Sequence, residues 1–300
     1  MERSIDLVIP MVFPADPVWR QEHYRYKGGD ARQHVRYRSW GTEELLIRCC
    51  MKYMPWLRTI HILLAGESQV QEWMRDAVAL HGTQPEIRLV FHKDFIPAKY
   101  LPCFASPCIE MFLENIPGLS ECFIYANDDM FPLSPLKEED FFRDGLPCQH
   151  ITEKKYPDMP GTFMRKCMWQ QNMIAKPFGK RFTNTVPETG HIFSAIRKSS
   201  CREVWRRHGE EITYWLSPLK RTDHSANNWI YQLYQQYSGQ YIDHRPIRHY
   251  TDQATPIGKI VEIIRSPKAG IVCLNDNEHI TDWKERARIV REEIERKLKV

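Results

Sequence analysis

Residues 5–13 read Ile-Asp-Leu-Val-Ile-Pro-Met-Val-Phe, an almost unbroken apolar run that predicts a buried strand. Pro10 lies inside the run, and because proline has no backbone N–H, we expect the strand to end or bend there. Further apolar runs follow at 59–65, 86–91 and 121–126, with helix-like segments among them. Strands and helices that alternate at these lengths predict an α/β fold with a largely parallel sheet covered by helices.

Helix signals lie between and after these strands. Thr42 is a candidate N-cap followed by two glutamates, and Ser106-Pro107 opens a helix that we expect to end near residue 117. From Pro132 to about Pro187 the periodicity fades, which predicts an irregular lobe or lid. The other expected elements are helices at 42–54, 68–81, 198–208, 225–237 and 282–299 and a strand at 270–274.

The composition of the 300-residue chain is that of an ordinary globular protein, with 42% hydrophobic and 27% charged residues. A net charge of +4 is too small for the basic footprint of a nucleic-acid-binding protein, so we expect no nucleic-acid partner. We expect no transmembrane segment, because no apolar run reaches ~18 residues, and no signal peptide. A cytoplasmic protein is therefore predicted, with peripheral association at the inner face of a bacterial membrane left open.

The nine cysteines are an odd number, and none has the C-x-x-C spacing of a zinc site. We therefore expect free thiols in a reducing compartment and no zinc.

Two adjacent carboxylates, Asp128 and Asp129, directly follow the apolar run at 121–126. Ligands of open parallel sheets bind beyond the carboxyl ends of the strands. Oxygen ligands at this position suit a hard cation, Mg²⁺ or Mn²⁺, that could neutralise diphosphate charge. The alternative interpretation is a simple turn, since Asn and Asp are common turn residues.

An ordered series of motifs extends through the first half of the chain. It comprises Arg36-Tyr37-Arg38-Ser39-Trp40-Gly41-Thr42, Lys52-Tyr53-Met54-Pro55-Trp56-Leu57-Arg58, Val90-Phe91-His92-Lys93-Asp94-Phe95-Ile96-Pro97, and Asn127-Asp128-Asp129. The series resembles the second conserved region of the Stealth family of sugar-phosphate transferases. Three further parts of the chain resemble the family's other conserved regions. Ile5-Asp6-Leu7-Val8 resembles the first region, His191 with Arg221 and Asn227-Asn228-Trp229 resembles the third, and Leu274-Asn275-Asp276-Asn277 resembles the fourth.

The resemblance implies a GT-A-like fold, in which a mostly parallel nucleotide-sugar-binding sheet has helices on both faces and carries an irregular or helical lobe. On this basis we divide the chain into a nucleotide-sugar-binding core at 1–145, an acceptor and catalytic lobe at 146–269, and a strand and helix at 270–300 that return to the core. The implied activity is transfer of a sugar-1-phosphate from a nucleotide-sugar to a carbohydrate acceptor in bacterial capsule or cell-surface polysaccharide synthesis.

The resemblance also suggests residue roles. The expected catalytic residues are Asp129, His191 and Arg221, and the expected metal ligands are Asp128, Asp129 and Asp276. Arginine presents a bidentate fork to phosphate, and imidazole titrates near neutral pH. The expected donor-binding residues are Asp6, Arg36, Arg38, Asp94 and Asn127.

Two rival functions fit parts of the same pattern. A GT-A glycosyltransferase that releases a nucleoside diphosphate would use the same acidic metal ligands. A non-catalytic carbohydrate- or nucleotide-binding protein would not need them. The chain also departs from the family pattern, because Glu44 takes the position of a family arginine and Ser225 that of a family aspartate.

Overall fold

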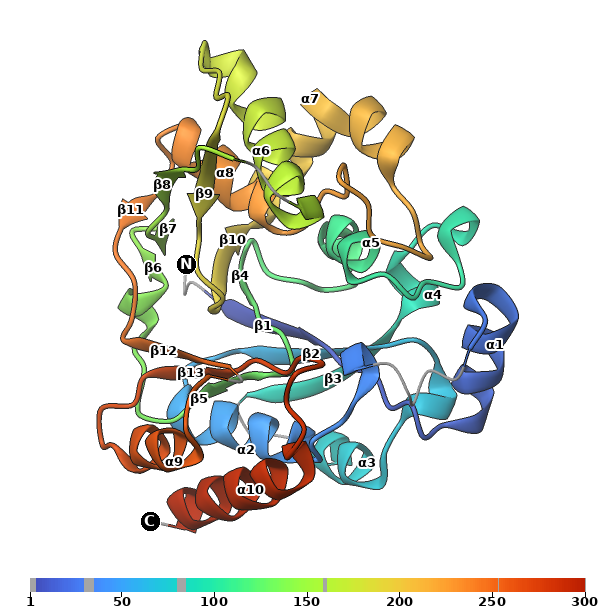
Figure 1. Ribbon diagram of the computed structural model, residues 1–300, viewed down its shortest axis with the longest axis vertical. Helices are drawn as coiled ribbons and strands as arrows, with labels where there is room; N and C mark the ends of the chain where they lie inside the picture. The colour runs from blue at the N-terminus through green and yellow to red at the C-terminus, as the bar shows by residue number, and fades with distance from the viewer. Residues whose placement is uncertain (1–3, 30–34, 80–84, 159–160, 253, 300) are drawn as a thin grey trace.

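A five-stranded sheet forms the centre of the computed structural model (Figure 1). The structure describes residues 4–29, 35–79, 85–158, 161–252 and 254–299. The strands are β1 Ile5–Pro10, β2 Thr59–Leu64, β3 Glu86–Phe91, β4 Cys122–Tyr125 and β10 Ser194–Arg197. They lie in the order β10-β4-β1-β2-β3, and within this sheet only β10 is antiparallel to its neighbour. The predicted α/β fold with a largely parallel sheet is therefore confirmed, and β1 ends at Pro10 as expected.

Apolar side chains on the two faces of the sheet belong to two separate cores. In β1, Leu7 and Ile9 contribute to one core, whereas Val8, on the opposite face, contributes to the other. The helices that supply the first core include α2 Glu43–Tyr53, α9 Ile257–Arg265 and α10 Trp283–Lys299. Those that supply the second include α5 Ser106–Met111, α7 Lys198–Trp215 and α8 Trp229–Tyr237 (Figure 1). Helices on both faces of the sheet are thus confirmed.

A second sheet joins the two halves of the chain. It contains β5 Met130–Pro132, β12 Arg248–Thr251 and β13 Ile271–Leu274 in the order β12-β13-β5. Gly270 leads into β13 with φ 63°, and a Cβ there would lie 2.0 Å from the carbonyl oxygen of Ile247. Only glycine allows this close approach. The pairing of β13 with β5 brings the end of the chain beside the residues that follow β4.

The segment between Pro132 and Pro187 is more regular than its sequence predicts. It contains β6 Phe142–Arg143, β7 Leu146–Gln149, β8 Thr152–Lys155, β9 Thr185–Glu188 and α6 Gly161–Ala175. These four strands have only two to four residues each, and every residue of β8 is exposed. Strands this short do not show the alternation of apolar and polar residues by which a strand is predicted from sequence. The other α-helices and the other strand in the described part of the chain are α1 Pro17–Lys27, α3 Glu72–Ala79, α4 His92–Phe95 and β11 Ile242–Asp243.

The segment at 146–269 is not separate from the rest of the molecule. Its β10 pairs with β4 in the central sheet, and its β12 pairs with β13 in the second sheet. Among the helices that the structure describes, none is both long enough and apolar enough to cross a membrane.

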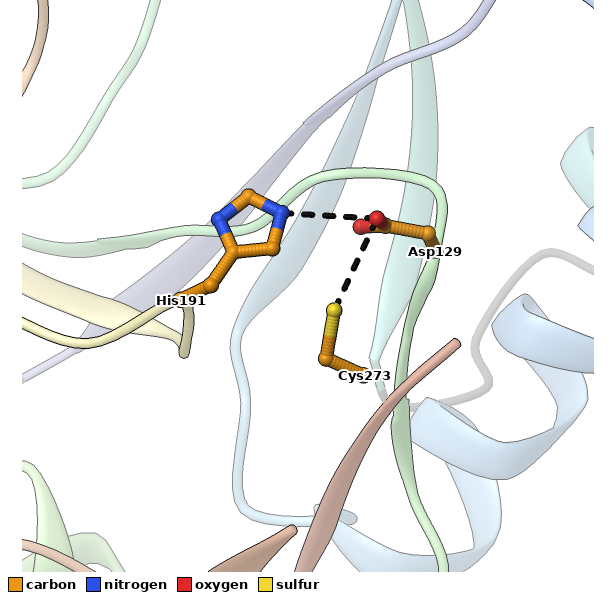
Figure 2. Close-up of side chains that lie close together, drawn as sticks. All are labelled: Asp129, His191 and Cys273. Atoms are coloured by element: carbon orange, nitrogen blue, oxygen red, sulfur yellow. Dashed lines mark hydrogen bonds and ion pairs between the residues drawn. The ribbon is translucent and has the colours of Figure 1, made fainter. Parts of the chain in front are cut away.

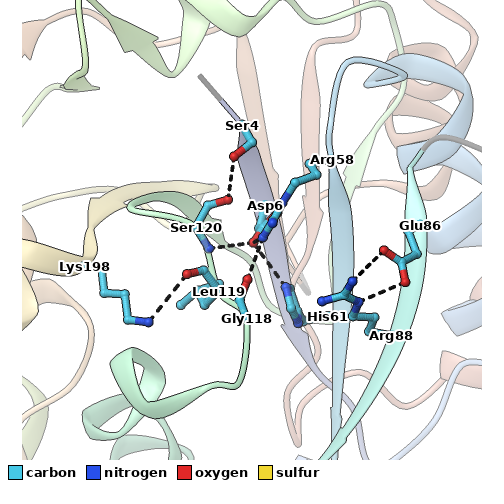
Figure 3. A network of polar contacts seen from close by, with 10 residues as sticks. All are labelled: Ser4, Asp6, Arg58, His61, Glu86, Arg88, Gly118, Leu119, Ser120 and Lys198. Carbon is cyan, nitrogen blue, oxygen red and sulfur yellow. Dashed lines mark hydrogen bonds and ion pairs between the residues drawn. The ribbon is translucent and has the colours of Figure 1, made fainter. Parts of the chain in front are cut away.

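A buried polar network closes the amino-terminal end of the central sheet (Figure 3). Asp6 in β1 is fully buried and accepts hydrogen bonds from Arg58 Nε at 2.8 Å and from the Ser120 backbone N–H at 2.7 Å. His61 Nε2 lies 3.2 Å from the same carboxylate. Burial raises the pKa of Asp6, but the hydrogen bonds from His61, Arg58 and Ser120 outweigh this effect and lower the pKa to about 2. Asp6 therefore ties β1, β2 and the loop before β4 together.

Candidate active site

A cleft of about 430 Å³ lies at the carboxyl ends of the parallel strands. It is lined by residues that directly follow all four of them: Met11 and Val12 after β1, Ala65 after β2, His92 after β3, and Asn127 to Asp129 after β4. This is the position that an open parallel sheet favours for ligands. The charged residues of its lining are Lys27, Arg38, Glu43, Asp128, Asp129, Lys220, Arg221 and Asp276.

Two side chains that line the cleft, Asp129 and His191, lie close to the thiol of Cys273, which is buried behind the lining (Figure 2). His191 Nε2 lies 3.3 Å from Asp129 Oδ2, and the Cys273 thiol donates to the same oxygen at 3.6 Å. The register of β13 and β5 pairs Cys273 with Met130, the residue after Asp129. The Leu274 N–H also donates to the Asp129 carbonyl at 2.8 Å. Strand pairing therefore fixes how Asp129 and Cys273 face each other.

The two carboxyl groups after β4 lie close enough to affect each other's protonation. Burial and the carboxylates of Asp129 and Glu43 raise the pKa of Asp128 to about 7. Asp129 Oδ1 is buried and has no hydrogen-bond partner among the described residues. A buried carboxylate oxygen without a partner is costly unless a cation compensates it. The donor set at Asp129 therefore fits a divalent cation.

His191 is held in the turn before β10. Burial lowers its pKa, but the hydrogen bond and the charge of Asp129 outweigh burial, so the pKa of His191 is raised above 6.5. Its Nε2 also lies 3.5 Å from Asn127 Nδ2. His191 and Asn127 thus lie together beside the acidic pair.

Arg221 lines the same cleft, in the segment between α7 and α8. Its guanidinium donates to the hydroxyl of Ser106, the first residue of α5. Lys220 lines the cleft beside it. Arg221 and His191 are thirty positions apart in sequence, and the fold brings both to one cavity.

Arg38 and Asp276 line the cleft as an ion pair. Arg38 Nε donates to Asp276 Oδ2 at 2.6 Å, and Nη2 donates to Asp276 Oδ1 and, at 3.0 Å, to the Asn277 carbonyl. The guanidinium also lies 4.9 Å from the ring centre of Trp283. Asp276 is thus neutralised by Arg38 and does not belong to the three-residue group around Asp129.

Two expected donor-binding residues, Asp6 and Asp94, do not line the cleft. Asp6 lies at the opposite end of β1, in the buried network described above. Asp94 is exposed and accepts a hydrogen bond from the Phe91 N–H at 2.8 Å, so it caps α4. The side chain of Arg36 lies outside the described residues. The structural roles of Asp6 and Asp94 give a sufficient physical reason for their positions.

One wall of the cleft is aromatic, which the sequence did not predict. The ring of Trp19 lies 5.2 Å from that of Tyr37 and 5.7 Å from that of Phe104, edge to face in both cases. Lys27 Nζ donates to the Tyr37 hydroxyl at 3.1 Å. Asp16 caps α1, where Trp19 and Lys27 lie, by accepting hydrogen bonds from the Val18 and Trp19 N–H groups. The cleft therefore has an aromatic wall as well as an acidic floor.

Comparison with known proteins identifies the family of this chain. The model of Stealth protein CR2, conserved region 2, matches residues 36–149. The capsular polysaccharide phosphotransferase WcwK of Streptococcus pneumoniae is 27% identical over 99% of this chain and 97% of that protein. The chain belongs to the Stealth family. The matched region of this Stealth protein includes four residues that line the cleft: Arg38, Asn127, Asp128 and Asp129.

Other relatives extend the same pattern. The receptor polysaccharide phosphotransferase WefC of Streptococcus gordonii is 28% identical over 94% of the Stealth chain and 93% of its own length. The capsular polysaccharide phosphotransferase LcbA of Neisseria meningitidis is 30% identical over 75% of the chain and 62% of its own length. Among solved structures, the galactosyltransferase LgtC with donor and acceptor sugar analogues aligns over 97% of this chain and 95% of that chain, with 14% identity and a TM-score of 0.46.

Proposed function

We propose that this Stealth protein is a metal-dependent phosphotransferase. Its donor would be a nucleotide-sugar, expected to be UDP-linked, and its acceptor a carbohydrate hydroxyl. The sugar would be transferred together with its phosphate, and a nucleoside monophosphate would be released. The observation that carries the proposal is the meeting of Asp129, His191 and Arg221 in one cleft at the ends of the parallel strands. The reaction class is supported by the relatives WcwK, WefC and LcbA, which are named as polysaccharide phosphotransferases.

A divalent cation at Asp129, expected to be Mg²⁺ or Mn²⁺, would supply positive charge to the diphosphate oxygens of the donor. The protein must hold that charge in a fixed position, and the hydrogen bond from the Leu274 N–H to the Asp129 carbonyl supports this role. Asp128 lies next to Asp129 in the same cleft lining, and its raised pKa means that a bound cation would favour its ionised form. Together these carboxylates would orient the diphosphate at the floor of the cleft.

The proposed chemical step takes place at the phosphorus that carries the sugar. The acceptor oxygen forms a new P–O bond, the phosphoanhydride bond to the nucleoside monophosphate breaks, and the acceptor proton passes to a base. His191 would act as that base or stabilise phosphate charge, because its Nε2 lies 3.3 Å from Asp129 Oδ2 and a positioned imidazole can take up or donate a proton. Arg221 would bind non-bridging phosphate oxygens through its planar guanidinium.

The aromatic wall suits the flat parts of the donor. Tyr37 is the most exposed of the three rings, Trp19 and Phe104 pack behind it, and Lys27 adds a cation at the same wall. A nucleobase stacks on such rings irrespective of its identity. We propose that the nucleoside lies at this wall and that the diphosphate reaches from it to the acidic floor.

The direct test is a product analysis with a panel of UDP-sugars and a capsular oligosaccharide acceptor. The proposed function predicts an acceptor product that contains a phosphodiester, detected by phosphorus NMR and sensitive to mild acid. A modified acceptor that contains no phosphorus would indicate the glycosyltransferase alternative. Binding of donor without any acceptor product would indicate a binding protein.

A further inference from the structure

An exposed tyrosine lies directly beside His191, outside the lining of the cleft. Tyr250 is 50% exposed, and the centre of its ring lies 6.3 Å from that of His191, edge to face. An exposed tyrosine ring combines a flat apolar surface with a hydroxyl that can hydrogen-bond. The molecule therefore offers a surface for a partly apolar, partly polar ligand next to the proposed base.

An arginine accompanies this tyrosine on the same strand. Arg248 and Tyr250 are two positions apart in β12, so both side chains project from the same face of the strand. The guanidinium of Arg248 packs against Gly190, the residue before His191, and leaves no room there for a Cβ. Both side chains thus face the turn that carries His191. β12 is an edge strand of its sheet and pairs with β13 on one side.

The positive charge at this strand lacks a direct counter-charge. Within the described residues, neither Arg245 nor the half-buried Arg248 forms an ion pair with a carboxylate. Burial and the charge of Arg245 lower the pKa of Arg248, and the charge of Glu188 does not offset them. Glu188 itself lies 3.6 Å from Lys154 Nζ. Neighbouring like charges of this kind attract an anionic ligand.

This surface lies away from the aromatic wall that the proposed function assigns to the nucleoside. That wall includes Trp19 and Lys27 of α1. Figure 1 shows α1 and β12 far apart, with the end of β1 between them. A donor that reaches from α1 to the acidic floor therefore leaves the β12 side of His191 to the acceptor.

We propose that Tyr250 and Arg248 form the acceptor subsite, and that the acceptor is a negatively charged glycan. One sugar stacks on the Tyr250 ring, and Arg248, with Arg245 beside it, binds a carboxylate or phosphodiester of the same glycan. A sugar that covers this ring lies beside His191, where a base must reach the acceptor hydroxyl. The part of this glycan in the reaction rests on the proposed function, whereas its binding does not.

Binding of three disaccharides to the full chain, without donor, tests the subsite. One disaccharide is neutral, one contains a uronic acid, and one is joined by a phosphodiester. In calorimetric titration we expect at least one anionic disaccharide to bind about tenfold more tightly than the neutral one. Which of the two does so identifies the anion. Equal binding of all three, tightest binding of the neutral one, or no binding at millimolar concentration would overturn the proposal.

Variants assign the two contacts. Arg248→Gln keeps much of the side chain that packs against Gly190 and should abolish the preference for the anionic disaccharide. Tyr250→Ala should weaken binding of all three about fivefold, and Tyr250→Phe should restore most of it. The control is Tyr214→Ala, because Tyr214 is also exposed and does not line the cleft. A preference that survives in Arg248→Gln, or equal losses in Tyr214→Ala and Tyr250→Ala, would refute the assignment.

Turnover separates this subsite from the proposed function. With a UDP-sugar and the tightest-binding disaccharide, Tyr250→Ala and Arg248→Gln should raise KM for the acceptor, with less than about a twofold change in KM for the donor. A loss of structure would instead change both constants. Release of UDP would defeat the proposed function and leave the binding results unchanged. Release of UMP, with an unchanged acceptor KM in both variants, would refute the subsite alone.

Discussion

Replacing Asp6 by Asn tests whether this carboxylate binds the donor or stabilises the sheet. In the wild-type protein Asp6 is fully buried and accepts hydrogen bonds from Arg58 and from the Ser120 N–H, with His61 at 3.2 Å. These contacts lower its pKa from 3.8 to about 2. At 1.36 kcal/mol per pKa unit, this corresponds to about 2 kcal/mol of stability.

The pH dependence has a defined direction. Because the pKa of Asp6 is lower in the folded state than in the unfolded state, its contribution is complete above about pH 4 and is lost as the pH falls towards 2. Asp6→Asn should therefore lower the free energy of unfolding by about 2 kcal/mol at pH 7, measured by urea denaturation. The difference between variant and wild type should shrink towards pH 2.

The control is the same substitution at Asp94, which is exposed and caps a four-residue helix. Asp94→Asn should cost about 1 kcal/mol or less. Neither variant should change KM for the donor, because neither residue lines the cleft. A raised KM for the nucleotide-sugar in Asp6→Asn, with stability unchanged, would refute the structural role and restore donor binding at this position.

Three further predictions concern the cleft and the second sheet. EDTA should abolish turnover and a divalent cation should restore it, whereas full activity in chelator would contradict the metal requirement. Asp129→Asn should lower turnover without unfolding the protein. His191→Ala and Arg221→Ala should each lower kcat about a hundredfold, equivalent to about 3 kcal/mol, with little change in Tm, and wild-type rates would remove them from the chemistry. Gly270→Ala should destabilise the fold by about 2 kcal/mol or more, because its φ is 63° and a Cβ would lie 2.0 Å from the Ile247 carbonyl oxygen; an unchanged Tm would contradict that close approach.

The central sheet could be predicted because its strands are coded locally. The runs that became β1 to β4 are apolar over several residues, and the signals at Thr42 and Ser106 mark where α2 and α5 begin. The capping itself differs from expectation, because Thr42 makes no side-chain capping hydrogen bond and Ala105, not Ser106, is the N-cap of α5. The expected helix from Ser106 is shorter than predicted, since α5 ends at Met111 and a 3-10 turn at Leu113–Asn115 follows. Local pattern could not reveal strands such as β6 or β11, which have two residues each.

The acidic floor of the cleft could also be predicted, because Asp128 and Asp129 follow an apolar strand directly. The position of Cys273 beside Asp129 could not be predicted from the sequence. Cys273 meets Asp129 through the antiparallel pairing of β13 with β5, a contact across 144 positions. The same holds for Arg38 and Asp276, which are 238 positions apart. Each of these side chains looks ordinary in its own segment, and only the fold gives it a partner.

The identity of the released nucleotide tests the central claim most directly. If the acceptor attacks the phosphorus that carries the sugar, the bond between the two phosphorus centres is cut and the sugar keeps one phosphate. We predict that UMP accumulates in proportion to modified acceptor when a UDP-sugar is the donor, measured by chromatography over a time course. Stoichiometric UDP, with no phosphorus in the acceptor product, would mean attack at the anomeric carbon and would contradict the phosphotransferase mechanism.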